Sequence, residues 1–393
     1  MPIPAERASA RVPSGVKALG AVSFFNDVAS EMVYPLLPAF VSRLGGGAVA
    51  LGALDGAADL VSAAIKWGSG ALADRPGWRR PLILAGYLVA VLVRPLMALS
   101  SAAWQVIGFR VVDRVGKGLR TPPRDALITE LTVPENRGRA FGFHRAADHL
   151  GAVMGSVAAW ALLARGTAVR DVIGWSIAPG VIAFVVLAVL LRSRTGAWAP
   201  APAPVRDGGP LDAAGRVFWA PVSALVALTL ARLPETLMLL RLQQLGVAVP
   251  VIPLVWGGLH VVRSAGSYPG GRLVDRAGPR NAVAAGALLA AIVLGALALP
   301  LAPVAAIAVF LAFGMAAGLT ESAERVLVAR LAPVRSGRGF GAYHALTGLA
   351  ALPAAVGFGA IYQSAGASAA FASSAGALLT AGVAWTIVAP RGL

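Results

Sequence analysis

Cysteine is absent from this chain, and charged residues are scarce. Without cysteine, the sequence excludes disulfides, thiolate metal sites and a cysteine nucleophile. Charged residues make up 13% of the 393 residues, hydrophobic residues make up 57%, and the mean hydropathy is +0.73. A water-soluble protein of this length needs far more polar surface. The composition therefore predicts an all-α, polytopic membrane protein with little chain left for a soluble domain.

Lysine is nearly absent too, because only Lys17, Lys66 and Lys117 occur and arginine supplies the other basic residues. A net charge of +16 could favour a nucleic-acid partner, but the arginines are scattered through short loops between apolar runs. That distribution follows the positive-inside rule of membrane proteins, so we expect no nucleic acid. The bias toward alanine, glycine and arginine points to a GC-rich bacterial genome.

Hydropathy predicts about twelve membrane spans, each near the roughly 20 residues needed to cross a bilayer. Their limits are 17–42, 49–73, 80–100, 102–131, 138–165, 172–192, 214–245, 250–273, 280–301, 304–331, 338–363 and 367–389. The proline-rich stretch between the sixth and seventh spans is too broken for a helix. We therefore expect an N-terminal six-helix bundle over 1–192, a cytoplasmic linker over 193–213 and a C-terminal six-helix bundle over 214–393.

The loop arginines fall overwhelmingly on one side of the predicted membrane. That side carries Arg7, Arg11, Arg75, Arg79, Arg80, Arg137, Arg139, Arg192, Arg194, Arg206, Arg276, Arg280, Arg335, Arg338 and Arg391. The other side carries Arg43, Arg165 and Arg170. We therefore expect a multi-pass protein of the bacterial inner (plasma) membrane with both termini cytoplasmic. The first apolar segment lacks a small-residue cleavage site, so we expect an uncleaved span.

One polar loop motif occurs twice, 201 residues apart, which is about half of the chain. Its members are Gly70, Asp74, Arg75 and Gly77 in the first copy and Gly271, Asp275, Arg276 and Gly278 in the second. The same offset aligns Gly56 with Gly257 and Asp59 with His260. Duplicated halves around a central site are typical of transporters, and we expect a two-fold axis along the membrane normal to relate them.

These motifs resemble those of the major facilitator superfamily. The segment Gly70–Gly77 is similar to its G-x-L-A-D-R-x-G signature between spans two and three, and Arg114–Gly118 is similar to its R-x-x-Q-G signature in span four. The resemblance covers nearly the whole chain. It implies two six-helix bundles, a shared central cavity and rocking-type alternating access. Span five keeps Gly151 and Gly155 but lacks the proline that many proton-coupled exporters of the family carry.

The duplicated loop has a physical interpretation of its own. Its glycines allow a tight turn close to neighbouring helix ends, and Asp74 can cap a helix N-terminus or pair with an arginine. We interpret the motif as a gate that holds the cytoplasmic side closed. The alternative is that its arginines only fix the topology.

Several ionisable residues fall in the middle of predicted spans, where an unpaired charge costs roughly 2.5–3.5 kcal/mol. Counting about 1.5 Å per helical residue places Asp27, Asp59 and Arg114 about 15 Å deep, near the bilayer centre. Glu31 follows Asp27 by four residues, so the two side chains share a helix face. Acids beside an arginine at this depth are what a proton relay requires, because protonation releases the partner. We assign these four residues to proton coupling and expect Arg114 within salt-bridge reach of Asp27 or Glu31.

A second set of residues in the spans is assigned to the substrate cavity. Its members are Asp55, Arg94, Arg120, His144, Asp148, His149, Trp256 and His260. For the lone His260, a packing role is an equal alternative. The other charges of span four are interpreted as structural ion pairs, namely Arg110, Asp113, Lys117, Arg124 and Asp125. The dipeptide Pro122-Pro123 predicts a break in that span.

The leading functional hypothesis is a secondary active transporter that exports a small solute by proton-coupled alternating access. A metal-ion or metal-chelate carrier is the alternative, with oxygen and nitrogen ligands from Asp27, Glu31, Asp55, Asp59, His144 and His149. The sequence lacks phosphate-loop, zinc-protease and serine-hydrolase motifs, so a membrane-embedded enzyme is a remote third. We expect no cofactor and no resident metal. We also expect a monomer whose partners are the solute, protons and the lipid bilayer.

Overall fold

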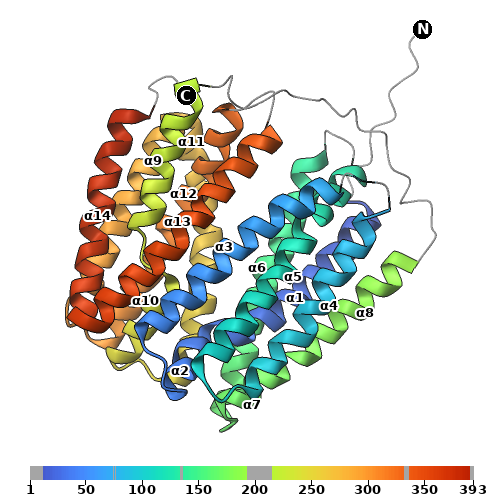
Figure 1. Cartoon of the computed structure of the whole chain (residues 1–393), viewed down its shortest axis with the longest axis horizontal. Coiled ribbons are helices and arrows are strands. Elements are labelled where there is room, and N and C mark those ends of the chain that lie inside the picture. Colours follow the sequence, from blue (N-terminus) through green and yellow to red (C-terminus); the bar gives the residue numbers. More distant parts are fainter. Residues whose placement is uncertain are drawn as a thin grey trace.

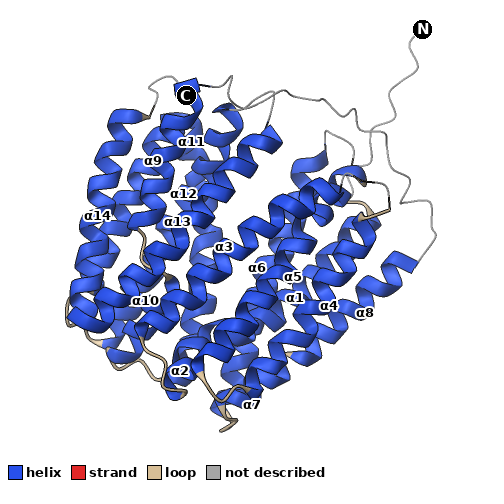
Figure 2. Ribbon diagram, in the orientation of Figure 1, coloured by secondary structure: helices blue, strands red, loops and turns tan. Residues whose placement is uncertain are grey.

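The computed structural model describes residues 12–73, 75, 77–132, 136–192, 215–331 and 336–389. Every regular element in these ranges is a helix (Figure 2). The first half contains α1 (Ser14–Val33), η1 (Tyr34–Leu36), α2 (Leu37–Arg43), α3 (Ala48–Ala73), α4 (Arg79–Leu96), η2 (Met97–Leu99), α5 (Ala103–Glu130), α6 (Arg137–Ala164), α7 (Val169–Trp175) and α8 (Ile177–Arg192). These helices account for the first six predicted spans.

The second half contains α9 (Gly215–Ala231), α10 (Glu235–Gln244), η6 (Val249–Val251), α11 (Ile252–Leu297), α12 (Pro303–Leu331), α13 (Ser336–Ala365) and α14 (Ala367–Val388). The long helix α11 comprises the eighth and ninth predicted spans, which meet at a kink where Gly278 has a φ of 79°. The predicted all-α fold of about twelve spans is confirmed. The first, sixth and seventh spans differ from the prediction in one respect, because each is interrupted. The interruptions are at η1, at Ser176 and at 232–234.

The helices form two bundles, seen side by side in Figure 1. In the first, α1 packs against α6 and α8, and α5 packs against α3 and α4. In the second, α11 packs against α12 and α14. We call the end that carries α2, α7 and α10 the distal end, and the end where α8 finishes and α9 begins the linker end. Contacts between α3 and α13, and between α6 and α11, join the bundles.

The backbone repeats the duplication seen in the sequence. In the described part of the chain, six glycines have positive φ, a conformation that other residues rarely adopt. They form three pairs, namely Gly45 with Gly246, Gly77 with Gly278, and Gly166 with Gly366. The first two pairs are 201 residues apart and the third is 200 apart. The two halves therefore turn at equivalent points, as the repeated motif predicts.

Small residues let the two halves approach closely along α3 and α13. A Cβ added at Gly52 would lie 2.1 Å from the carbonyl oxygen of Ala355, and one added at Gly56 would lie 2.7 Å from the Cα of Leu352. The repeat counterpart of Gly56 is Gly257, where an added Cβ would lie 3.0 Å from the Cβ of Ser156 on α6. The same glycine position therefore packs each half against the other, as small residues do in membrane helix pairs.

The predicted break at Pro122-Pro123 is wrong, because α5 runs unbroken from Ala103 to Glu130. A proline within a helix has no N–H to donate to the carbonyl four residues earlier, which for Pro122 is that of Gly118. The hydroxyl of Ser69 on α3 donates to this carbonyl at 2.7 Å. A partner from the neighbouring helix therefore satisfies the acceptor, as happens at prolines in membrane helices.

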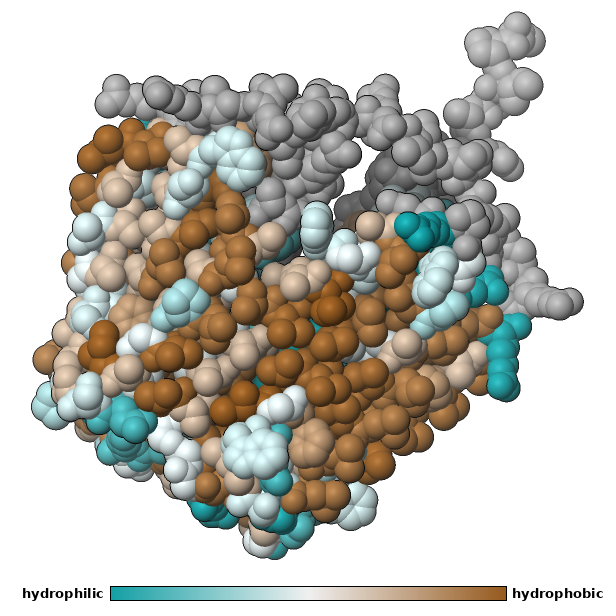
Figure 3. Space-filling view, in the orientation of Figure 1, coloured by the Kyte–Doolittle hydropathy of each residue, from teal (hydrophilic) through white to brown (hydrophobic). Residues whose placement is uncertain are grey.

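Apolar side chains cover the middle of the face shown in Figure 3, and hydrophilic ones gather toward its ends. Nine helical segments of the described residues are long and apolar enough to cross a membrane. Large apolar side chains such as Leu92 and Val189 are 54% and 65% exposed on the outer surface. This surface fits contact with lipid, and the chain is a multi-pass membrane protein.

We predict that Gly52→Ala destabilises the protein by about 1–3 kcal/mol, because the added methyl group overpacks against α13. Thermal unfolding in detergent measures the change. Gly68→Ala, on the same helix, is the matched control, because its Cβ would meet no atom within 4 Å. Equal unfolding temperatures for the two variants would show that close packing at Gly52 contributes nothing to the stability of the protein.

Candidate functional site

A buried charge cluster lies between α4 and α5 in the first half. Nε of Arg94 donates to Oδ1 of Asp113 at 2.9 Å, and Nη1 of Arg110 lies 3.6 Å from Oδ2. Arg94 also donates to the backbone carbonyl of Asn26 at 2.9 Å and to its side-chain oxygen at 3.1 Å. Asp113 is fully buried and Arg94 is 3% exposed. In this conformation Arg94, which we had assigned to the substrate cavity, joins α1, α4 and α5.

Other charges of α5 also have partners within the first half. Arg120 donates to the carbonyl of Gly86 at 3.2 Å, and its guanidinium lies 4.8 Å from the ring centre of Tyr87. Arg124 forms an ion pair with Asp125 at 2.9 Å. Arg120 is 4% exposed, so it too is enclosed between helices in this conformation.

Asp55 on α3 contacts the second half at the start of α10. Its Oδ2 accepts from the hydroxyl of Thr236 at 2.7 Å and from the N–H of Thr236 at 3.3 Å. The hydroxyl of Tyr34 donates to both carboxylate oxygens at 3.2 Å. The side chains of all three residues are buried.

Glu31 near the end of α1 makes a second contact with the other half. Nε1 of Trp256 on α11 donates to Oε2 of Glu31 at 2.7 Å, and Nε2 of His260 lies 3.8 Å from the same oxygen. The side chains of Glu31 and His260 are 17% and 14% exposed, so both are largely enclosed. The ring of His260 lies 6.2 Å from that of His149 on α6.

The remaining predicted coupling residues lie on the first half. Asp27 accepts from the side-chain amide of Asn26 at 2.9 Å. Nε of Arg114 lies 3.8 Å from Asp113, and in the described residues the ion pairs of Arg114 include neither Asp27 nor Glu31. The expected pairing of Arg114 with those acids is therefore not formed in this conformation. Asp59 is exposed on α3.

His144 and Asp148 are one turn apart on α6. Nδ1 of His144 lies 3.5 Å from Oδ2 of Asp148, and His144 is 3% exposed. A different polar group lies in the second half, where Arg263 on α11 pairs with Glu235 of α10 and lies 3.8 Å from Glu321 of α12. Among the described residues, no group of three or more His, Asp or Glu side chains is placed to hold a metal ion.

The duplicated loop motif is described only in part. Asp74 and the side chain of Asp275 lie outside the described residues. Gly77 and Gly278 have φ values of 82° and 79°, so both copies make the same turn. The helix α3 passes through Gly70, and α11 passes through Gly271. Arg75 and Arg276 are exposed beside these turns, which fits either a gating or a topological role.

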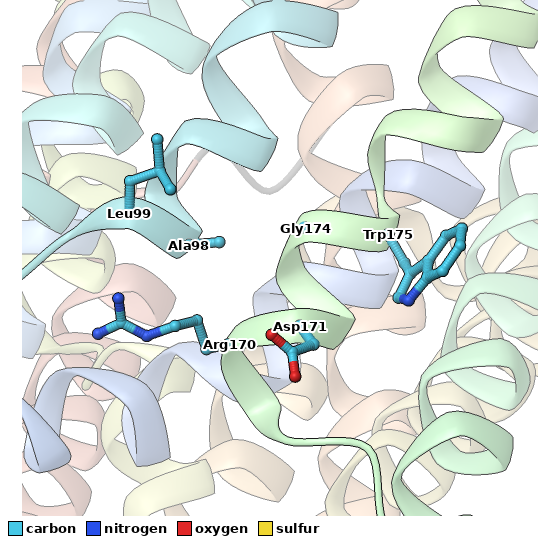
Figure 4. Close-up of a pocket in the computed structure, with 6 residues that line it drawn as sticks. All are labelled: Ala98, Leu99, Arg170, Asp171, Gly174 and Trp175. Atoms are coloured by element: carbon cyan, nitrogen blue, oxygen red, sulfur yellow. The ribbon is translucent and has the colours of Figure 1, made fainter.

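A surface cavity of about 360 Å³ lies at the distal end, away from these contacts (Figure 4). It is lined by Ala98, Leu99, Arg170, Asp171, Gly174 and Trp175. In Figure 4 the side chain of Arg170 extends from α7 to the side where Ala98 and Leu99 of η2 lie, whereas Trp175 points away from them. This cavity contains none of the residues assigned from the sequence to coupling, substrate or gating.

Sequence reasoning missed two residues of the contact with Asp55, namely Tyr34 and Thr236. Both were placed inside uninterrupted spans and carry no charge. A signal for Thr236 was present, because Pro234 followed by Glu235 is typical of the start of a helix. That signal predicts a helix N-terminus inside the seventh span. Asp55 contacts this N-terminus by accepting from the N–H of Thr236.

Residues 19–240 match the family model of the Major Facilitator Superfamily, which is more than half of the chain. The chain belongs to the major facilitator superfamily.

Over 141 residues it is 37% identical to an uncharacterised MFS-type transporter of Methanocaldococcus jannaschii, covering 36% of this chain and 35% of that protein. Over 134 residues it is 37% identical to multidrug resistance protein MdtH of Proteus mirabilis, covering 34% of this chain and 33% of that protein. Each match therefore spans about a third of the relative.

Solved structures share the fold over nearly the whole chain. A bacterial homolog of the human lysosomal transporter Spinster, inward-facing and unoccupied, has a TM-score of 0.69, 17% identity and 95% coverage of both chains. The nucleoside transporter NupG has a TM-score of 0.75 and 12% identity, covering 95% of this chain and 99% of that one. At such low identity these likenesses show the superfamily fold alone.

We predict that Asp113→Leu lowers the free energy of unfolding by about 3–5 kcal/mol, because it leaves buried arginines without their carboxylate. Adding Arg94→Met should recover part of the loss, since one unpaired guanidinium is removed. Tryptophan fluorescence during thermal unfolding in detergent measures both variants. A double variant no more stable than Asp113→Leu would contradict a structural pair of Arg94 with Asp113.

Proposed function

We propose that this chain is a proton-coupled exporter that moves a small organic solute across the bacterial inner membrane by alternating access. Membership of the superfamily supports transport, and the similarity to MdtH, a multidrug resistance protein, supports the outward direction. The observation that carries proton coupling is the contact of Glu31 with Trp256 and His260. An acid that joins the two halves links its own protonation to their relative movement.

The coupling group comprises Asp27, Glu31, Asp59 and Arg114. Asp27 lies one helical turn from Glu31, and neither Asp27 nor Asp59 forms an ion pair with a described residue. An acid without a cationic partner is free to gain and lose a proton without breaking the packing of the bundle. We therefore assign proton exchange to Asp27, with Glu31 transmitting the change to the second half.

The rest of the arrangement follows the same scheme. We place the termini and the linker 193–213 in the cytoplasm, between bundles that comprise 1–192 and 214–393. The solute passes between the bundles, where His149 of α6 and His260 of α11 face each other. The duplicated loops at the linker end then form the cytoplasmic gate.

We predict that Asp27→Asn abolishes transport driven by a pH gradient but leaves the protein folded and able to bind substrate, because the volume is kept and only the charge is lost. Glu31→Gln should reduce coupling less completely, since Glu31 lies a turn nearer the distal end. Proteoliposomes with an imposed pH gradient, screened across organic anions, organic cations and divalent metals, provide the measurement.

Asp171→Asn is the matched control, because Asp171 is an exposed acid on α7 outside the coupling group. Thermal unfolding and equilibrium substrate binding separate lost coupling from lost structure. Wild-type transport rates and an unchanged pH profile in both the Asp27 and the Glu31 variants would show that these acids are structural.

A further inference from the structure

Two polar contacts join the halves on the distal side of the centre, and one residue of each stands at the same position of the repeat. Asp55 on α3 reaches Thr236 of the second half. Trp256 on α11 reaches Glu31 of the first half. Trp256 lies 201 residues after Asp55, which is the offset of the repeat. Position 55 and its counterpart 256 therefore each extend across the interface from equivalent helices.

The Asp55 contact is a helix cap supplied by the other half of the protein. The helix α10 begins at Glu235, and its N-cap residue Pro234 makes no side-chain capping hydrogen bond. The first N–H groups of a helix have no partner within the helix, and a carboxylate stabilises them. Oδ2 of Asp55 accepts both the N–H and the hydroxyl of Thr236. Thr236 is fully buried and Asp55 is 9% exposed, so water does not compete freely for these bonds.

Tyr34 connects this cap with the second contact. Its hydroxyl donates to Asp55, and its ring centre lies 4.9 Å from that of Trp256, which donates to Glu31. The guanidinium of Arg110 on α5 lies 4.7 Å from the ring of Tyr34. A continuous chain of contacts therefore runs across the interface from Glu31 to Thr236.

We propose that Asp55 is the positioning residue of a distal gate, holding the two halves together by capping α10 across the interface. The proposal rests on the alternating access proposed above, because opening at the distal end then requires Asp55 to release Thr236. Asp55 acts on the position of α10 and does not carry the coupled proton. The hydrogen bond from Trp256, the repeat counterpart of Asp55, to Glu31 also holds the two halves together at the distal gate.

Because the chain has no cysteine, spin labels can be placed at introduced cysteines alone. Ser42 on α2 and Ala302 before α12 are exposed, one in each half. Arg241 of α10 donates to the carbonyl of Leu297, the last residue of α11, and to that of Leu299 in the loop before α12. These bonds tie the loop that carries Ala302 to the distal end. Double electron–electron resonance between labels at 42 and 302 measures distal opening without substrate or a pH gradient. The result is thus independent of whether transport is proton-coupled.

We expect Asp55→Ala to shift the closed–open equilibrium toward the longer distance by about tenfold, the effect of losing a charged hydrogen bond. Asp55→Asn keeps an acceptor for Thr236 and should shift it less. Thr236→Val is nearly isosteric and should shift it in the same direction, and the double variant should shift it no further than Asp55→Ala. Asp171→Ala is the control and should leave the distances unchanged.

Unchanged distances in a folded Asp55→Ala protein would overturn the proposal, as would fully additive shifts from Asp55→Ala and Thr236→Val. If Asp55→Ala does not fold, Thr236→Val decides the question alone, because it removes the hydroxyl donor without removing a charge. A wild-type protein that shows no pH-driven transport, but whose distances respond as expected, would refute the coupling proposal and leave the gate intact.

Discussion

The membrane interior tolerates a charge only where a partner or water stabilises it, and this constraint organises the first half of the protein. Asp113 meets it by pairing with Arg94 and lying near Arg110 and Arg114. Arg94 in turn bonds to the backbone and side chain of Asn26. Three helices, α1, α4 and α5, are therefore held in register by charges that none of them could bury alone.

Duplication supplies the second organising feature. The two halves turn at equivalent glycines and pack against each other through Gly56 and its counterpart Gly257. Their chemistry has nevertheless diverged, because position 55 is an acid in one half and position 256 is a tryptophan in the other. Asp55 and Glu31 are the acids of the two cross-contacts, and they act in different ways. One caps a helix, and the other accepts from an indole.

Much of the fold was predictable, because span length and hydropathy are dictated by the bilayer. Predicted span limits agree with the helix ends to within a few residues, and the repeat identified equivalent turns. The errors came from tertiary partners. At the break expected at Pro122 the helix continues, and the carbonyl of Gly118 accepts from Ser69 on another helix. The helix that starts after the interruption at 232–234, α10, is contacted at its N-terminus by Asp55, which is far away in the sequence.

The site was less predictable, for a related reason. Helix rise gives the depth of a side chain, but the rotation and packing of the helices decide which partner it meets. Depth therefore placed Arg114 level with Asp27, whereas packing gives it Asp113 as its ion partner. Among the described residues, the hydrogen bond of Asp27 is to the neighbouring amide of Asn26, and no ion pair within 4 Å holds it. A charge locked by several partners can stabilise a bundle but cannot easily change state. The acids that remain lightly held, or that join the two halves, are thus the ones to which we assign the proposed coupling.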